Sequence, residues 1–408
     1  MRASSAGINS SGCALQNVPS VREPQAVKRI AARVIAEVVV ASIGAAFLTG
    51  AIVANQRFLD RHFVPSFFLP RHWYVVLETS GRLVMAALGA WLVTLGRSHA
   101  GRFTSRAPAR ALHVFIATIL ALGASNLMLR RVHLRPYEWL SPDEEPRRQL
   151  DPRLGWTWLP GRTGHKIVGG RAIDYAIDPA GYRVSRVDEP VDLERPTILF
   201  TGESVMFGEG LNWEETIPAQ VGTMMGMQTA NLAVHGYGND QAYLRLQTEL
   251  PHFRQPVAVV SLFMTSLFGR NLDQDRPHLG PGLVWLPAEQ RPRLSSLAKL
   301  IVPYRADTTV DRGVTVTREV LRATTELARV HGATPLLVVL QFGHEEQHEQ
   351  VLRRRILDNA SIPYVLVEID SSWRLPWDRH PNARVARAIA TIIASELRGR
   401  LNVAAGVK

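Results

Sequence analysis

Two segments far apart in the chain carry residue types that could do acyl-transfer chemistry together. Ser204 lies in GESVMFGEG (residues 202–210), and His380 lies in WDRHPN (residues 377–382), two positions after Asp378. A serine hydroxyl is a weak nucleophile unless a base takes its proton, and a histidine oriented by a carboxylate is the usual base. We therefore interpret Ser204 as a candidate nucleophile, His380 as its base and Asp378 as the group that orients His380. The glycines around Ser204 allow a tight turn whose N–H groups can bind a developing oxyanion.

These residues need a scaffold that brings both segments to one place. After residue 195, short apolar runs alternate with segments of helical spacing, which is typical of a parallel sheet with helices on both faces. The predicted strands are Thr197–Thr201, Val257–Met264, Pro335–Phe342 and Tyr364–Ile369, and the predicted helices are Trp213–Met225, Val316–Val330, Glu345–Leu357 and Ala383–Leu401. Ligands of such sheets bind at the carboxyl ends of the strands, and Ser204 directly follows the first one.

The same segments resemble sequence blocks of the SGNH (GDSL-type) hydrolase superfamily. Residues 202–210 resemble its first block, NLAVHGYG (residues 231–238) its second block and residues 378–382 its fifth. The resemblance extends over residues 150–400 and implies a three-layer α/β/α, flavodoxin-like fold. It also implies a Ser204–His380–Asp378 triad, with an oxyanion site formed by the N–H groups of Ser204 and Gly236.

The lead-in to the first strand narrows the expected substrate. DPRLGW (residues 151–156) and Gly181-Tyr182-Arg183 are similar to membrane-tethered members associated with cell-envelope or exported polysaccharides. The resemblance therefore implies an acyl ester, of the acetyl type, on a carbohydrate, and it implies no metal or other cofactor. Water as the acceptor would give an esterase and a sugar hydroxyl an O-acyltransferase; the sequence leaves both open.

Three departures from the family pattern bear on activity. Glu203 stands where the family has Asp, which is not a triad member, and the Asp-x-His spacing is shorter than the commoner Asp-x-x-His, so Asp370 is a spare orienting acid. The third block should offer an Asn after the Val257–Met264 strand, where this chain has Thr265 and Ser266. Loss of one oxyanion donor typically costs 10²–10³ in turnover. Either hydroxyl could replace it as a substrate contact.

Several alternatives stay open at this point. Ser204 could be no more than a helix N-cap, and Trp377 could stack on a sugar or form an apolar cap. His344-Glu345-Glu346-Gln347-His348 matches the zinc-peptidase pattern H-E-x-x-H, although it follows directly on a strand and lacks an evident third ligand. The rival of a different class is an impaired SGNH-like protein that binds glycans or serves polysaccharide assembly.

The N-terminal third is predicted to be a membrane region. A bilayer core needs about 20 mostly apolar residues, and residues 30–54, 73–95 and 111–129 form three such stretches. This predicts a tail (1–29), a membrane region (30–135), a linker with a small β-rich lead-in (136–195) and a catalytic domain (196–404). Lys and Arg are more numerous in the tail and in the second loop than in the other flanks, which predicts a cytoplasmic tail. The catalytic domain would then lie outside the cytoplasm, anchored in the inner (plasma) membrane.

Composition excludes other classes. The first 150 residues hold 18 of the 47 basic residues but only 8 of the 36 acidic ones, so most of the net charge of +11 belongs to the membrane region. A nucleic-acid-binding domain should carry its own basic face, and the larger domain does not. One cysteine, Cys13, excludes an intrachain disulfide and a thiolate metal cluster.

Overall fold

The computed structural model describes residues 23–65, 71–131, 140, 143–289, 304–375 and 380–406. Two compact units make up the chain. The first comprises Met1–Asn55 and Leu77–Ala124, and the second comprises Gln56–Val76 and Ser125–Lys408.

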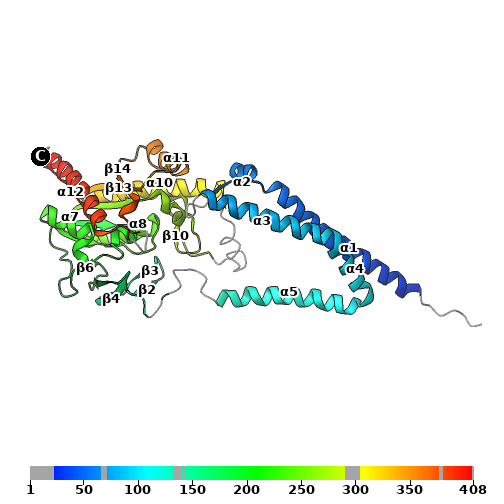
Figure 1. Ribbon diagram of the computed structural model, residues 1–408. Helices are drawn as coiled ribbons and strands as arrows, with labels where there is room; N and C mark the ends of the chain where they lie inside the picture. The colour runs from blue at the N-terminus through cyan, green and yellow to red at the C-terminus, as the bar shows by residue number, and fades with distance from the viewer. Residues whose placement is uncertain are drawn as a thin grey trace, which may run out of the picture. The chain divides into compact units, whose positions relative to one another are not determined.

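The first unit is helical, as the apolar stretches predict. Its helices are α1 (Glu23–Val53), α3 (Arg71–Trp91), the π-helical turn η1 (Leu92–Gly96), α4 (Arg97–Arg106) and α5 (Pro108–Arg131) (Figure 1). Three helical stretches, Ala26–Val53, His72–Arg106 and Pro108–Leu129, are long and apolar enough to cross a membrane. A Cβ on Gly89 would lie 2.8 Å from the carbonyl oxygen of Gly44, so these glycines let α1 and α3 approach closely.

The second unit contains the predicted α/β sheet. Its strands are β4 (Arg162–Val168), β5 (Arg171–Ile177), β6 (Arg183–Val184), β7 (Thr197–Thr201), β8 (Gln228–Asn231), β9 (Pro256–Phe263), β13 (Thr334–Phe342) and β14 (Val365–Ile369). The spatial order is β14-β13-β9-β7-β8-β6-β5-β4. The five strands from β14 to β8 are parallel. When these five are numbered in chain order, their spatial order from β8 to β14 is 2-1-3-4-5, the flavodoxin-like arrangement. The predicted fold class is confirmed.

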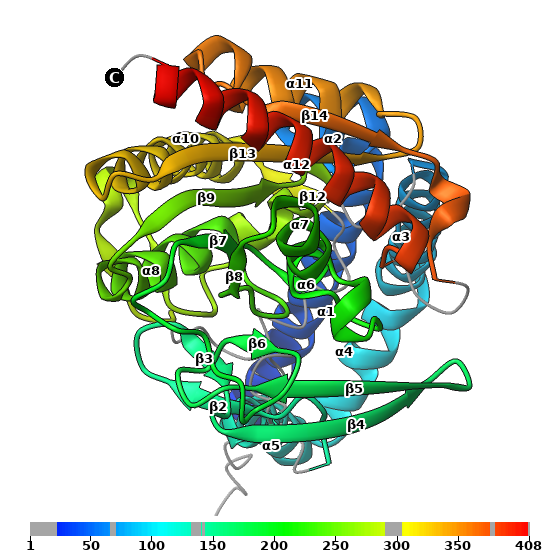
Figure 2. The same ribbon diagram turned by 90° about the vertical axis from the view of Figure 1, so that its left-hand side faces the viewer.

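Helices cover both faces of this sheet, so the central strand β7 is buried along its whole length and β9 along most of it. On β7, Ile198 and Phe200 pack on one face with α7 (Ile217–Met225) and α12 (Ala383–Gly406). Figure 2 shows these two helices in front of the sheet. Leu199 points to the other face, where it packs with α8 (Asn239–Glu249) and the end of α10 (Asp307–Val330). The helix α11 (Gln347–Ile356) also packs on that second face.

The lead-in is continuous with the main sheet. Strands β6, β5 and β4 extend it antiparallel from β8, while β2 (Arg148–Asp151) and β3 (Gly155–Trp158) form a separate pair. Trp158 is buried and its indole Nε1–H donates to the carbonyl of Ala233, 3.0 Å away. The lead-in thus holds the loop that follows β8.

Shorter elements complete the second unit. They are α2 (Gln56–His62), β1 (Phe63–Pro65), α6 (Ser204–Phe207), η3 (Trp213–Glu215), η4 (Leu250–His252), η5 (Thr265–Leu272), β10 (His278–Leu279), η6 (Pro281–Leu283), β11 (Trp285–Leu286), β12 (Tyr304–Ala306), η7 (Asp358–Ala360) and η8 (Ser371–Trp373). The prediction of one helix over Trp213–Met225 is wrong, because the chain is extended at Thr216, which caps α7.

Candidate active site

Ser204 lies at the carboxyl edge of the sheet, at the start of a one-turn helix. The chain leaves β7 through Gly202, and Glu203 is the N-cap of α6, its carboxylate accepting the N–H of Val205 at 3.1 Å. Ser204 is therefore the first helical residue and not the cap. It is buried, with 1% of its surface exposed.

Two polar side chains, one from β6 and one from β8, donate hydrogen bonds to carbonyls at the C-terminal end of α6. Arg183 donates to the carbonyls of Phe207 (2.8 Å), Gly208 (2.7 Å) and Leu211 (2.5 Å), and its guanidinium lies over the Phe207 ring. Asn231, at the end of β8, also donates to the Phe207 carbonyl at 3.3 Å. Burial lowers the pKa of Arg183 to about 10, which still leaves it charged at neutral pH.

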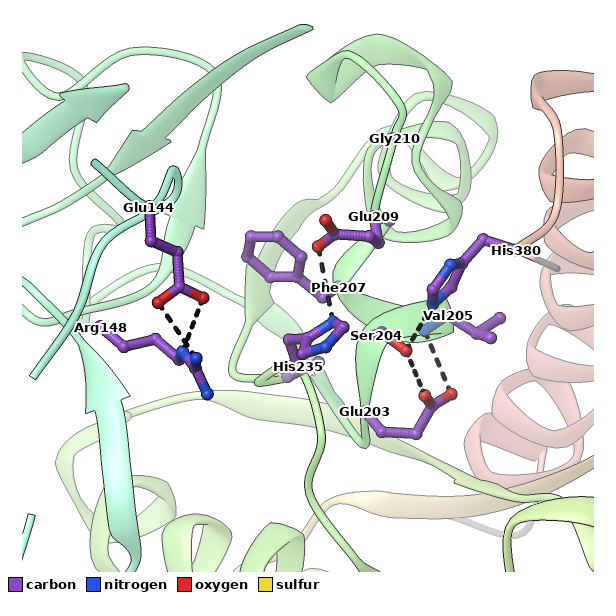
Figure 3. A network of polar contacts seen from close by, with 12 residues as sticks. Glu144, Arg148, Glu203, Ser204, Val205, Phe207, Glu209, Gly210, His235 and His380 are labelled. Atoms are coloured by element: carbon purple, nitrogen blue, oxygen red, sulfur yellow. Dashed lines mark hydrogen bonds and ion pairs between the residues drawn. The ribbon is translucent and has the colours of Figure 1, made fainter. Parts of the chain in front are cut away.

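His380 meets Ser204 across 176 positions of sequence. Its Nε2 lies 2.8 Å from the Ser204 Oγ (Figure 3). The segment that carries it is closed at its base, because the Leu375 N–H donates to the His380 carbonyl at 2.8 Å and Arg374 forms a β-bridge with Pro381. Asp378 and Trp377 lie outside the described residues, so their predicted roles stay predictions.

A second acceptor competes for the Ser204 hydroxyl. Glu203 Oε2 lies 2.6 Å from Ser204 Oγ, and Arg270 from η5 lies 3.2 Å from the same carboxylate oxygen. The carboxylate is nearly buried, so the guanidinium compensates its charge. The Glu203 side chain thus touches the candidate nucleophile itself, which the sequence did not predict.

The loop after β8 places Gly236 beside this helix turn. Val234 donates its N–H to the Gly202 carbonyl at 3.2 Å, and Trp156 donates its indole Nε1–H to the His235 carbonyl at 2.9 Å. Gly236 has φ +82°, and a Cβ there would lie 3.2 Å from the Trp156 ring, so glycine is required twice over. Within the described ranges, the backbone N–H groups of Ser204 and Gly236 have no hydrogen-bond partner. Both are available to an oxyanion.

His235 and Glu209 form a polar pair that the sequence did not predict. The imidazole of His235 lies next to the candidate dyad, because its centroid is 6.2 Å from that of the His380 imidazole. Within the pair, His235 Nδ1 lies 3.7 Å from Glu209 Oε2. Burial lowers the pKa of His235, Glu209 opposes this, and Arg270 adds to the lowering. The available sequence signal was the position of His235, directly before the candidate oxyanion glycine Gly236.

Other predicted contacts make no hydrogen bond to the dyad among the described residues. Thr265 is buried and Ser266 half-buried at the start of η5, and among the described residues neither side chain bonds to Ser204 or His380. The spare acid Asp370 caps η8, where the Ser372 N–H holds its pKa below the usual range. The first Asn after the Val257–Met264 strand is Asn271, and its amide donates to Asn239 and Thr317.

The zinc-peptidase pattern does not have the geometry that it needs. Its two histidines must lie on one helix face, yet α11 begins at Gln347, with Glu346 as its N-cap. His344 therefore precedes the helix, and only His348 lies on it.

Comparisons with known proteins find likeness at the level of structure. No protein-family profile matches, and no curated protein does. Among solved structures, the chain is similar to a protein assigned to the G-D-S-L lipolytic family from Desulfitobacterium hafniense (13% identity, 50% of this chain, 98% of that one, TM-score 0.33). It is also similar to the acetyl xylan esterase Est2A from Butyrivibrio proteoclasticus (12%, 52%, 66%, 0.33) and to a family two carbohydrate esterase from Cellvibrio japonicus (13%, 52%, 64%, 0.31).

Proposed function

We propose that the chain is a serine ester hydrolase or O-acyltransferase of the SGNH type. The observation that carries this proposal is the 2.8 Å contact between Ser204 Oγ and His380 Nε2 at the carboxyl edge of the parallel sheet. The backbone N–H groups of Ser204 and Gly236 support it, because acyl transfer needs donors for a developing oxyanion and neither group is bonded within the described part of the chain.

The reaction follows from these positions. Ser204 Oγ attacks the ester carbonyl carbon while its proton passes to His380 Nε2. The oxyanion that forms accepts hydrogen bonds from the backbone N–H groups of Ser204 and Gly236. When the tetrahedral intermediate collapses, the C–O bond to the alcohol breaks and His380 returns the proton to the leaving oxygen. Water or a sugar hydroxyl then attacks the acyl-Ser204, losing its proton to His380, and Ser204 is regenerated. Asp378 is proposed to orient the imidazole.

The proposed substrate is an acetyl or other acyl ester of a cell-envelope or exported glycan. The sequence resemblance supports this class, and the three helices long enough to cross a membrane support an anchored enzyme in contact with the lipid bilayer. We place the catalytic domain outside the cytoplasm on the charge asymmetry of the loops. No part of the proposal involves nucleic acid.

Hydrolysis of p-nitrophenyl acetate by the detergent-solubilised full chain tests the proposal. We expect Ser204→Ala and His380→Ala each to lower kcat/KM by at least about 10³-fold, because nucleophile and base act as a unit. His252 lies on η4, directly after α8. The control variant His252→Phe should hydrolyse p-nitrophenyl acetate at the wild-type rate. Wild-type turnover in Ser204→Ala protein would contradict the proposal.

The second candidate is a fold-conserving protein that binds glycans without cleaving them. The 2.6 Å contact between Glu203 and Ser204 favours it, because a hydroxyl committed to a carboxylate is less available to His380. A folded wild-type protein that binds an acetylated xylan but hydrolyses neither it nor p-nitrophenyl acetate would establish this alternative.

A further inference from the structure

The pair His235–Glu209 faces the candidate dyad and has no part in the triad mechanism. Glu209 is fixed by the nucleophile turn, since its backbone N–H donates to the Ser204 carbonyl at 3.0 Å. His235 directly precedes the candidate oxyanion glycine. Figure 3 shows the two side chains together, on the side of Ser204 away from Glu203.

The two ring nitrogens of His235 have different surroundings. Nδ1 is sealed from solvent and makes no hydrogen bond to any residue that the structure describes, and it faces the Glu209 carboxylate at 3.7 Å. The side chain as a whole is 41% exposed, and Nε2, unlike Nδ1, is not among the buried unpaired atoms of the described residues. The carboxylate favours the proton on Nδ1, which leaves Nε2 as the acceptor nitrogen of the ring.

Burial favours the neutral ring. Glu209 is itself shared with Lys166, whose Nζ lies 3.4 Å from Oε1. Burial lowers the pKa of His235, the Glu209 carboxylate opposes this, and the positive charges of Arg270 and Arg148 add to the lowering. At neutral pH Nε2 is therefore an acceptor.

From this geometry we propose that His235 Nε2 accepts a hydrogen bond from a free hydroxyl next to the ester on the substrate's alcohol portion. His380 must lie about 3 Å from the leaving oxygen to return the proton. A ring whose centroid is 6.2 Å from that of His380 reaches the neighbouring position on the alcohol. Esters of vicinal diols, as in a partly acylated sugar, offer a hydroxyl there. The inference rests on the proposed function and makes His235 a specificity residue within it.

The test compares two substrates in one enzyme. A monoacetylated methyl xyloside with a free neighbouring hydroxyl is paired with its deoxy analogue, and the ratio of the two kcat/KM values is measured. We expect a preference of about 10-fold for the hydroxyl ester in the wild type, the size expected for one hydrogen bond. His235→Phe should lower this ratio to about one, whatever happens to the absolute rates.

A matched control and a second variant complete the experiment. His252 Nδ1 also lies 3.7 Å from a glutamate, Glu249, so His252→Phe should leave the wild-type ratio unchanged. Glu209→Gln, which no longer favours the proton on Nδ1, should lower the ratio part of the way. A 10-fold preference that persists in His235→Phe overturns the inference while leaving the proposed function standing. Equal turnover by Ser204→Ala would instead overturn the proposed function.

Discussion

Ser204 Oγ lies between two acceptors, and catalysis depends on which one receives its proton. His380 Nε2 is 2.8 Å away and Glu203 Oε2 is 2.6 Å away. Glu203 also caps α6 and pairs with Arg270, so its carboxylate is already committed to other partners. We infer that Glu203 positions the nucleophile and that His380 is the base.

Variants of Glu203 separate these roles. Glu203→Ala removes the N-cap and should lower the free energy of unfolding by about 1 kcal/mol, while Glu203→Gln keeps an oxygen for the Val205 N–H and should lose less. Both should retain measurable hydrolysis of p-nitrophenyl acetate. If Glu203→Gln removed turnover as completely as His380→Ala, then Glu203 would be as essential as His380, and the inferred positioning role would be wrong.

His235 predicts a dependence of stability on pH. Its pKa is lowered in the folded protein, chiefly by burial, so below the ordinary histidine pKa of about 6.5 the unfolded chain binds more protons than the folded one. Stability should therefore fall as the pH decreases through that value. His235→Phe lacks this contribution, so the Tm of the wild type minus the Tm of the variant should decrease from pH 7.5 to pH 5.5. An increase in this difference would contradict the assigned direction.

At the scale of elements, the nucleophile helix is too short to hold its own shape. Only four residues form α6, and its last carbonyls take their hydrogen bonds from Arg183 and Asn231. The lead-in thus contributes a buried cation to the site from a strand outside the parallel part of the sheet.

Removal of this cation should be costly. Arg183→Met removes a donor from three carbonyls, but Phe207 keeps Asn231 and Gly208 keeps the Leu211 N–H, so among the described contacts only the Leu211 carbonyl loses its donor. An unpaired buried carbonyl costs about 1–3 kcal/mol, so we expect Tm to fall by about 3–10 °C. Arg183→Lys keeps the charge but lacks the forked geometry, and it should recover only part of the loss. Differential scanning fluorimetry measures both. An Arg183→Met protein as stable as wild type would show that the contacts do not hold α6.

The strands could be predicted from sequence more readily than the helices near the site. β7 is buried on both faces, so Thr197–Thr201 is a plain apolar run and its bounds were predicted as observed. The helix α8 was missed because its buried positions include Asp240, Gln241 and Arg245, which remove the apolar periodicity. These side chains bond to backbone far away in sequence, Gln241 to the Leu154 carbonyl and Arg245 to that of Gly181. Such partners are known only once the chain has folded.

The site shows the same division. Ser204 and His380 occur in motifs with fixed local chemistry, and their contact could be expected from strand order. The His235–Glu209 pair and the Arg270–Glu203 pair depend on how three loops converge, which no local pattern encodes.

At the scale of the whole molecule, the chain combines an apolar helical region with an α/β region whose net charge is close to zero. The long helices expose many large apolar side chains, including Leu83, Val84 and Leu120. Exposed apolar surface of this extent fits contact with lipid.

We predict that the full chain sediments with membranes, resists extraction by alkaline carbonate and is released by detergent. A phosphatase reporter fused after Lys408 should be active only if that end lies outside the cytoplasm, as the positive-inside rule predicts. A cytoplasmic reporter such as β-galactosidase at the same position should be inactive. The reverse pattern would place the proposed active site in the cytoplasm.

The most direct test is covalent labelling by a fluorophosphonate probe, with the adduct located by mass spectrometry. A serine hydroxyl activated by His380 should attack the probe, so one adduct is expected on the peptide that contains Ser204. It should be absent in Ser204→Ala and reduced by at least about 10³-fold in rate in His380→Ala. A folded wild-type protein that stays unlabelled, or one labelled elsewhere with Ser204 unmodified, would contradict an activated serine at the edge of this sheet.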